Sequence, residues 1–355
     1  MSGTTTHPHV ERAEALYGME RYEEGLALVD RRLAEAPDDH EAWTTRARCL
    51  RTLDRFEESL AAAEEALKLE PELADGHFMR GCALRSLRRL PEADLAQREA
   101  IRLAPYRWGP RVQRAEMLIF IGTKEEALQE AHEAVRRGPD EVATWHTMYK
   151  VAAFNGRNDL VQESVRQLLR IDPTDSLAVG DVTWHEANKP GTTAERAADL
   201  YAGALAAVPD SASLRGDLDR AVYRMLRGTR WLALLCLVMA AVTLDVLPVG
   251  GEEPKDLPVH LGTRLWALAL MAAVWGFGAW RRHLRMRAGA RMAVRDLVRR
   301  LFWPRVVLGQ AALATLCAVL IVLVPWTDRT IPQVLFWLGL VPNLLSITHD
   351  RDKVR

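Results

Sequence analysis

The chain has 355 residues, and its 47 Lys and Arg residues balance its 47 Asp and Glu residues, so the formal net charge is zero. This balance argues against nucleic acid as a partner, because affinity for phosphate backbones depends on an excess of basic side chains. The two parts of the chain nevertheless differ. Residues 1–230 carry 32 basic and 39 acidic side chains, whereas residues 231–355 carry 15 and 8. We expect these parts to occupy different environments.

The start of the chain and its cysteines suggest an intracellular setting. Met1–Glu14 has no apolar core and no cleavage-like site, so we expect no signal peptide, and a disordered start at residues 1–5. The four cysteines lie far apart, without metal-ligand or redox spacing, and are Cys49, Cys82, Cys236 and Cys317. We expect them to be small buried thiols in a reducing compartment.

A period of 34 residues runs through the first half of the chain. It is carried by five prolines, namely Pro37, Pro71, Pro105, Pro139 and Pro173. Small residues recur with the same step, in columns that begin at Ala13, Ala66 and Ala93. Proline ends a helix because it lacks the amide donor, and small residues let helices approach closely. The period therefore predicts helical hairpins, which stack into a solenoid because one hairpin cannot bury its own apolar face.

These residues resemble the tetratricopeptide repeat, whose 34-residue pattern places Trp, Leu-Gly, Tyr, Ala, an aromatic residue, Ala and Pro in order. The second, third and fourth repeats match this pattern best, through Trp43, Ala47, Ala66, Pro71, Gly81, Ala93, Ala100, Pro105, Ala115, Gly122, Ala127, Ala134 and Pro139. The resemblance covers residues 6–173 as five repeats. Residues 174–228 form a degenerate sixth repeat, interrupted near Lys189–Gly191, and a capping helix.

The resemblance implies a right-handed superhelix whose concave face, lined by the first helix of each repeat, binds a protein or peptide segment. Carried over position by position, the candidate groove residues are Thr44, Arg48, Arg51, Phe78, Arg85, Val112, Ile119, His146, Lys150 and Phe154. Family members that bind chaperone tails use a lysine and an asparagine where this chain has Val10 and Glu14, so that specialised binding is not expected. The groove arginines beside Phe78 predict a segment with acidic and apolar residues.

A further arginine column lies just before one of the small-residue columns. Its members are Arg12, Arg46, Arg80 and Arg114. Two interpretations are open. The stems can pack on their helices with solvated guanidinium groups, or the column can face a ligand.

Four apolar stretches follow the repeats, at residues 231–249, 265–280, 306–326 and 331–347. A helix needs about 20 such residues to cross a bilayer, with a range of about 17–25. We therefore expect a membrane domain over residues 229–349 with four spans, followed by a tail at residues 350–355. Pro332 and Pro342 are tolerable in the fourth span where neighbouring groups satisfy the freed carbonyls.

The orientation follows from a basic loop at residues 281–305. Its nine arginines are Arg281, Arg282, Arg285, Arg287, Arg291, Arg295, Arg299, Arg300 and Arg305. Because positive charge stays on the cytosolic side, we expect this loop, both termini and the repeats to be cytosolic. The loop is either a simple connector or, from Ala290 to Phe302, an amphipathic helix on anionic lipid. The strong preference for Arg over Lys suggests a high-GC bacterial source and hence a plasma membrane.

No pattern in the chain predicts catalysis. It has no glycine-rich phosphate loop, nucleophile elbow or metal-ligand spacing, so we expect no enzyme activity, no cofactor and no metal. Asp245 is the acidic residue that interrupts a span. We expect it at the outer interface, and a proton or ion role is the alternative.

The sequence thus predicts an all-α protein, with a solenoid of five to six tetratricopeptide-type repeats followed by a four-helix transmembrane domain. We expect a membrane-anchored scaffold for protein–protein interaction. The alternative is a regulatory or assembly subunit of a transport or envelope complex in which the four-span bundle is the working part. Few polar residues occur in the spans, which favours anchoring; they are Asp245, Gln310, Thr315, Gln333 and Asn343.

Overall fold

The computed structural model describes residues 7–247, 257–285, 294, 296–300 and 302–349. The regular elements in these ranges are all helices, and they confirm the all-α fold. The chain divides into two compact units, Met1–Pro173 and Thr174–Arg355, each of which is described by itself.

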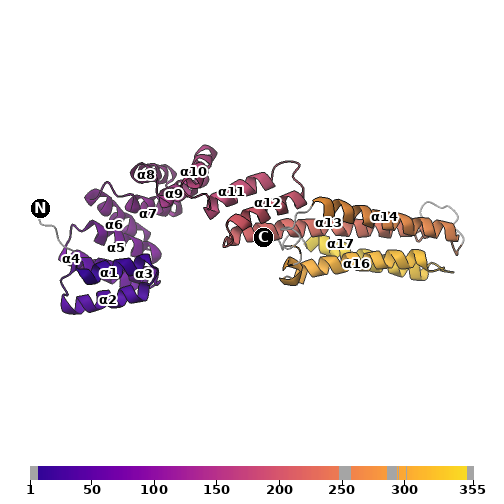
Figure 1. Ribbon diagram of the computed structural model, residues 1–355, viewed down its shortest axis with the longest axis horizontal. Coiled ribbons are helices and arrows are strands. Elements are labelled where there is room, and N and C mark those ends of the chain that lie inside the picture. Colours follow the sequence, from indigo (N-terminus) through magenta and orange to yellow (C-terminus); the bar gives the residue numbers. More distant parts are fainter. Residues whose placement is uncertain (1–6, 248–256, 286–293, 295, 301, 350–355) are drawn as a thin grey trace. The chain divides into compact units, whose positions relative to one another are not determined.

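The first unit consists of five helical hairpins, coloured indigo to magenta in Figure 1. Their helices are α1 (Pro8–Gly18), α2 (Tyr22–Glu35), α3 (His40–Thr52), α4 (Phe56–Leu69), α5 (Ala74–Ser86), α6 (Leu90–Leu103), α7 (Trp108–Ile121), α8 (Lys124–Arg137), α9 (Val142–Phe154) and α10 (Asn158–Ile171). Each helix packs against its hairpin partner and against the next hairpin. This is the solenoid that the 34-residue period predicts.

The small-residue columns explain the close packing of this solenoid. Ala13, Ala47 and Ala115 are fully buried. At the fourth position of the same column, a Cβ added to Gly81 would lie 2.4 Å from the Nε2 atom of Gln97. Because Gln97 is itself buried, this contact leaves no room for a side chain at position 81.

The turn inside each hairpin requires a left-handed backbone. The residue at this point recurs every 34 residues, with φ of 61° at Glu20, 58° at Asp54, 61° at Arg88, 88° at Gly122 and 69° at Gly156. Glycine adopts this conformation freely, whereas other residues lose roughly 1 kcal/mol. The sequence reveals the turn only at its two glycines, because the other three turns hold residues that do not favour it.

The arginine column links neighbouring hairpins by ion pairs. Arg46 lies 2.7 Å from Asp30, and Arg80 lies 3.7 Å from Glu64, in each case on the preceding second helix. Arg114 is the most buried member and pairs with three carboxylates, at 2.8 Å, 2.9 Å and 2.5 Å; these belong to Asp94, Glu126 and Glu130. The guanidinium groups thus face carboxylates of neighbouring helices, where the packed interpretation expected them to be solvated.

Asp39 caps the N-terminus of α3 and supplies a pH-dependent contribution to stability. Its Oδ1 accepts the Ala42 N–H at 3.0 Å, and Arg32 Nε donates to its Oδ2 at 2.7 Å. Burial alone would raise the pKa of Asp39, but these two donors outweigh it and hold the pKa below its ordinary value. The folded array therefore favours the ionised carboxylate.

We expect Asp39→Ala to lower the free energy of unfolding at pH 7 by about 1–2 kcal/mol, the usual effect of losing a helix cap. Because the pKa of Asp39 is lowered by folding, its contribution is complete above the unfolded pKa of about 4 and disappears as the pH falls through the folded pKa. Thermal unfolding of both proteins at pH 7 and in acid measures this. The exposed neighbour Asp38 provides the control, and an equal effect of Asp38→Ala would contradict the assignment.

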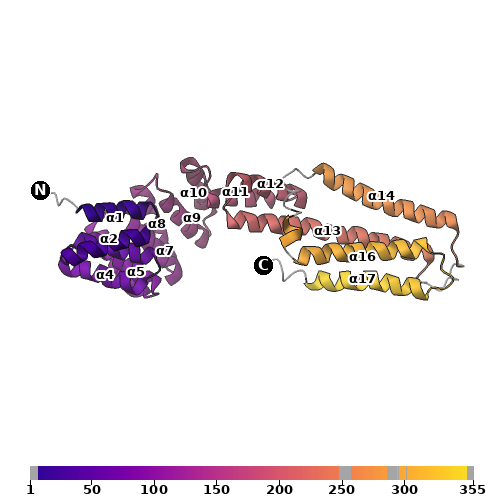
Figure 2. The same cartoon turned by 60° about the horizontal axis from the view of Figure 1, so that its bottom comes forward.

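The second unit begins with a hairpin and continues with four longer helices. They are α11 (Ser176–Ala187), α12 (Ala194–Ala207), α13 (Ala212–Leu244), α14 (Leu261–Arg285), α16 (Phe302–Leu323) and α17 (Thr330–His349). In both Figure 1 and Figure 2, α16 and α17 lie beside the second half of α13. The degenerate sixth repeat therefore belongs to the same compact unit as the apolar helices.

Helix α13 continues through the point where the sequence suggests a boundary. The expected capping helix at 211–228 and the expected first span at 231–249 form one helix, because no residue between them breaks it. It ends at Leu244, where Asp245 adopts a left-handed conformation with φ of 51°. Asp245 thus terminates the helix, and its carbonyl accepts the Arg329 Nε–H at 3.2 Å.

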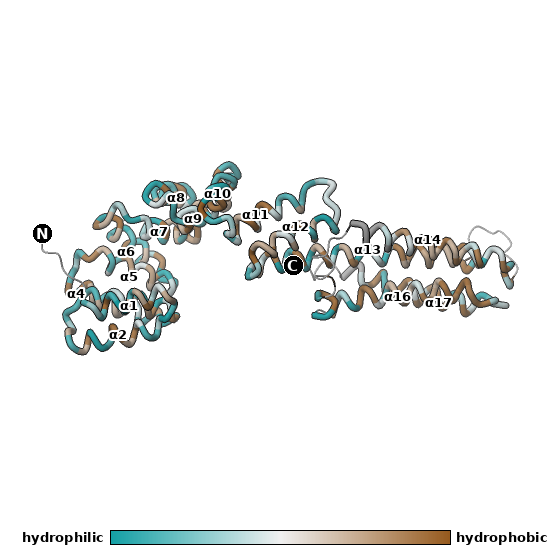
Figure 3. The backbone as a smooth tube through the Cα atoms, in the orientation of Figure 1, coloured by the Kyte–Doolittle hydropathy of each residue, from teal (hydrophilic) through white to brown (hydrophobic). Residues whose placement is uncertain are grey.

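Among the described residues, three helices are long and apolar enough to cross a membrane: Ala212–Leu244, Leu261–Gly278 and Phe302–Leu323. The expected fourth span corresponds to a shorter apolar helix, Thr330–Ser346. Figure 3 shows the hydrophobic colouring of these helices, in contrast to the mixed colouring of the repeats. Apolar side chains also lie on their outward faces, as at Val242 and Trp266.

The described end of the basic loop packs against protein. Leu297 is only 1% exposed and belongs to one apolar cluster with Tyr201 of α12 and Val222 of α13. Val294 and Val298 pack against the same cluster. These three residues of the expected apolar face are therefore covered by protein, whereas Phe302 at its end is 68% exposed. Arg287, Arg291 and Arg295 lie outside the described residues.

Candidate functional site

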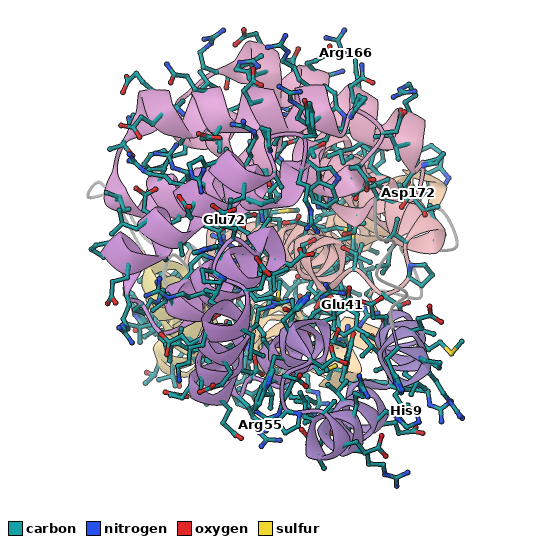
Figure 4. The ribbon with its side chains drawn as sticks, turned by 90° about the vertical axis from the view of Figure 1, so that its left-hand side faces the viewer. His9, Glu41, Arg55, Glu72, Arg166 and Asp172 are labelled. Carbon is teal, nitrogen blue, oxygen red and sulfur yellow. The ribbon has the colours of Figure 1, made fainter. Side chains whose placement is uncertain are left out.

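The candidate groove is built by the first helices of the repeats, α1, α3, α5, α7 and α9. Figure 4 looks along the repeats and shows charged side chains around them, such as the labelled Arg55, which precedes α4, and Arg166 of α10. Residues 34 positions apart occupy equivalent places on successive first helices. Their side chains can therefore meet across neighbouring repeats, and several of them do.

At the N-terminal end, Arg48 is paired within the array. It lies 3.4 Å from Glu14 of α1, and its guanidinium carbon lies 6.0 Å from the centre of the Tyr17 ring. A cavity of about 170 Å³ opens beside this pair. Its lining consists of Val10, Glu14, His40, Glu41, Thr44, Thr45, Arg48, Leu73 and Asp75. Carboxylates outnumber arginine at this end of the wall.

In the middle of the array, two candidate cations share one carboxylate. Arg85 of α5 lies 3.1 Å from Glu116 of α7, and Lys150 of α9 lies 2.7 Å from the same side chain. The three residues thus connect the first helices of repeats three, four and five. The wall is a mixed-charge surface, in contrast to the simple basic patch that the sequence suggests.

Arg51 differs from these cations. Its Nη2 lies 3.4 Å from the Tyr17 hydroxyl, and no carboxylate lies within ion-pair distance among the described residues. Its Nε is buried and makes no hydrogen bond within the same part of the chain. Phe78 is partly buried and packs on the apolar cluster beneath, which includes Leu50 and Cys82. Arg51 therefore has no carboxylate partner within the described residues, unlike Arg48 and Arg85.

The other candidates differ in accessibility. Thr44 and Val112 are buried, and Thr44 donates to the His40 carbonyl, so both contribute mainly to the floor of the wall. Ile119 is partly buried in the cluster below repeats four and five. Phe154 is 41% exposed at the edge of the array, where Lys124 lies 5.3 Å from its ring centre. His146 lies on α9 and has a partner of its own.

The sequence list omits three residues that shape this wall: Glu14, Tyr17 and Glu116. Each lies in a column already represented by a chosen residue, since Glu14, Arg48, Glu116 and Lys150 are related by multiples of 34. Opposite charges within one column were therefore a usable signal for the ion pairs. The candidate groove residues include no carboxylate, so these ion pairs were overlooked.

The described residues offer no metal centre, since no group of three or more His, Cys, Asp or Glu side chains could hold an ion there. Burial raises the pKa of the Cys49 and Cys82 thiols to about 11, so both are protonated and unreactive at neutral pH.

The comparisons with known proteins agree with the repeat geometry. The tetratricopeptide repeat family matches residues 40–73, which correspond to α3, α4 and the loop that follows. No curated protein matches the chain.

Several solved structures are similar in fold. The Cut9–Hcn1 hetero-tetramer of the APC/C has a TM-score of 0.50 at 15% identity, over 61% of this chain and 43% of that chain. PilW, a type IV pilus biogenesis factor, has a TM-score of 0.50 at 16% identity, over 58% of this chain and 94% of that chain. A thermophilic TPR protein of Thermus thermophilus is 22% identical over 50% of this chain and 96% of that chain, with a TM-score of 0.45. Identities this low show the fold alone. One repeat matches the tetratricopeptide repeat family, five hairpins follow its 34-residue period, and the C-terminal helices are candidates for spanning a membrane.

Proposed function

We propose that this protein is a membrane-anchored scaffold whose repeat array binds a segment of a partner protein along the wall formed by the first helices. Tetratricopeptide repeat proteins are generally non-catalytic scaffolds, so the role we propose is binding. The repeats would lie in the cytosol, and the apolar helices would hold them at a bilayer, which we infer to be a bacterial plasma membrane.

The observation that carries this proposal is the combination of Arg51 and Phe78. Arg48 and Arg85 already neutralise carboxylates of neighbouring repeats, whereas Arg51 keeps guanidinium donors without a carboxylate partner in the described chain. A carboxylate fits a guanidinium group through paired hydrogen bonds, and Phe78, on the next first helix, offers an apolar contact. The proposed ligand is therefore a segment that presents an acidic residue next to apolar ones.

We expect Arg51→Met to weaken binding of such a segment by about 1.5–3 kcal/mol, or roughly ten- to a hundredfold, since a hydrogen bond to a charged group contributes this much. A phage-displayed peptide library selected on the full-length protein in nanodiscs provides the ligands. Peptides with Asp or Glu beside apolar residues should be enriched, and their affinities should drop with the variant.

Arg55→Met is the matched control, because Arg55 is exposed and pairs only with Glu58 one turn along its own helix. If enriched peptides bind the Arg51 variant as well as the original protein, this wall is not the binding site. Neutral substitutions suit this test better than charge reversal. A glutamate at position 48 would face Glu14, and one at position 85 would face Glu116, so both would disturb the array itself.

The contacts between the C-terminal helices support anchoring over transport. Ser346 Oγ donates to Gln310 Oε1 at 2.9 Å, and Asn343 Nδ2 donates to the backbone carbonyls of Gln310 and Gly339 at 3.3 Å and 2.9 Å. Gln333 Nε2 donates to the Val246 carbonyl at 3.0 Å. These polar groups join helices to one another, which is their common use inside membranes. Anionic lipid near Arg281–Arg305 would add a second contact with the bilayer.

We expect both termini in the cytosol, because positive charge is retained on that side. In intact cells, a membrane-impermeant maleimide should label Glu252→Cys and Asp328→Cys and should leave the exposed Lys189→Cys unlabelled until the cells are opened. The four native cysteines are buried, so they give little background. Labelling of Lys189→Cys in sealed cells would reverse the topology.

A further inference from the structure

One column of the repeat array holds a tryptophan in two repeats and a histidine in a third. Trp43, His77 and Trp145 are related by multiples of 34 residues. Each places a ring nitrogen near the carbonyl of the proline six residues earlier. The distances are 2.8 Å to Pro37, 2.9 Å to Pro71 and 2.7 Å to Pro139, respectively. The three side chains therefore occupy equivalent positions in their repeats.

In the second repeat, the indole ring of Trp43 fills the space at this position. Trp43 packs against the cluster that contains the buried Leu33 of the preceding helix. Arg46, one turn further along α3, places its guanidinium carbon 5.6 Å from the centre of the indole ring and pairs with Asp30 at 2.7 Å. The ring is thus held between an aliphatic side chain and a guanidinium group.

In the third repeat, the smaller imidazole leaves the equivalent position open. A cavity of about 330 Å³ lies there, lined by Glu64, Leu67, Lys68, Pro71, His77 and Arg80. These six residues lie one period after Asp30, Leu33, Ala34, Pro37, Trp43 and Arg46. The aliphatic wall at Leu67 and the guanidinium at Arg80 are both kept. Arg80 Nε lies 3.7 Å from Glu64 and makes no hydrogen bond within the described part of the chain.

We propose that this cavity, the aromatic pocket, binds a tryptophan side chain of a partner protein. The incoming ring would restore the arrangement of Trp43 with Leu33 and Arg46. The pocket lies on another face of α5 than Phe78 and Arg85. His77 and Arg80 are three residues apart and share one stripe, and successive residues turn by about 100°. The site is therefore additional to the wall in the proposed function and does not depend on it.

The chemistry of the aromatic pocket favours an aromatic ligand over an aliphatic or a charged one. A guanidinium group attracts the face of an aromatic ring, most strongly that of indole. Leu67 and Pro71 offer apolar contact. The charges of Arg80 and Lys68 are accompanied by Glu64 and by Glu65, which lies 2.6 Å from Lys68, so the pocket has little net charge to select an ion. Its volume falls at the lower end of ligand pockets, which suits one side chain.

A fluorine label at the rim tests this proposal. In the full-length chain in nanodiscs, Lys68→Cys would carry a trifluoromethyl group, and the buried native cysteines would stay unlabelled. The matched control is Ala34→Cys, one period earlier, where Trp43 already fills the position. The probe is N-acetyl-tryptophanamide. We expect a saturable shift of the ¹⁹F signal at position 68 and none at position 34.

Two further measurements define the site. His77→Trp in the labelled chain should abolish the shift at position 68, because the new indole fills the pocket as Trp43 does in the preceding repeat. N-acetyl-leucinamide should need a roughly tenfold higher concentration, since a cation–π contact contributes on the order of 1.4 kcal/mol in a desolvated site. Equal shifts at both positions, an unchanged shift in a folded His77→Trp variant, or equal binding of the leucine probe would each overturn the proposal.

Discussion

Replacing Arg114 by methionine is expected to lower the free energy of unfolding of the repeat array by about 3 kcal/mol, because removal of one partner from a buried ion pair leaves its counter-charges uncompensated. The Arg114 side chain is 9% exposed and contacts Asp94, Glu126 and Glu130 from two second helices. Arg98 and Arg111 stay beside all three of these carboxylates, which places the effect at the lower end of the usual range of about 3–5 kcal/mol.

Thermal and chemical unfolding of the full-length protein, followed by helical circular dichroism, measures this loss. Arg98→Met is the control. Arg98 also pairs with Asp94 but is 57% exposed, so its removal should cost less than about 1 kcal/mol. Similar losses for the two variants would show that Arg114 contributes only as a surface cation.

Replacing Leu297 by alanine is expected to release the described end of the basic loop from α12 and α13. The substitution of a fully buried leucine costs about 2–5 kcal/mol. Local opening exposes the peptide bonds after Arg299 and Arg300. If the free energy of local opening falls by about 2 kcal/mol, the fraction of open molecules rises roughly thirtyfold. The rate of tryptic cleavage at these two bonds, measured by mass spectrometry in nanodiscs, should rise in proportion.

The exposed Asp296 provides the control on the same helical turn, and Asp296→Asn should leave cleavage nearly unchanged. The same experiment separates protein packing from lipid binding. If Leu297 rests on protein, the effect is the same with neutral and anionic lipid. Protection that depends on anionic lipid and is insensitive to Leu297→Ala would favour the interfacial helix instead.

The repeat architecture is predictable from the sequence because its determinants are local. Proline ends a helix wherever it stands, and a fully buried alanine column reflects a helix–helix distance that recurs in every repeat. The apolar stretches likewise predict long helices, and α13, α14, α16 and α17 lie where the four spans were expected. The continuous helix through residues 228–231 was missed, since a change of composition was taken for a boundary that the backbone does not need.

The candidate wall is only partly predictable. Position within the repeat correctly indicates which residues lie on the first helices. It does not indicate which cations are already paired, and Arg48, Arg85 and Lys150 prove to be neutralised by Glu14 and Glu116. Such pairs depend on the rotation between neighbouring hairpins and on side-chain length, and neither is a property of one segment.

The sequence by itself therefore determined the period, the all-helical hairpins and the apolar helices, because backbone hydrogen bonding, proline and the spacing of small residues act over a few turns of chain. The tertiary structure alone decided which arginines are paired with carboxylates, that Leu297 faces protein, and that a cavity opens beside His77. These outcomes depend on distances between residues that are far apart in the chain. Packing sets those distances, and a pattern along one stretch of sequence cannot specify them.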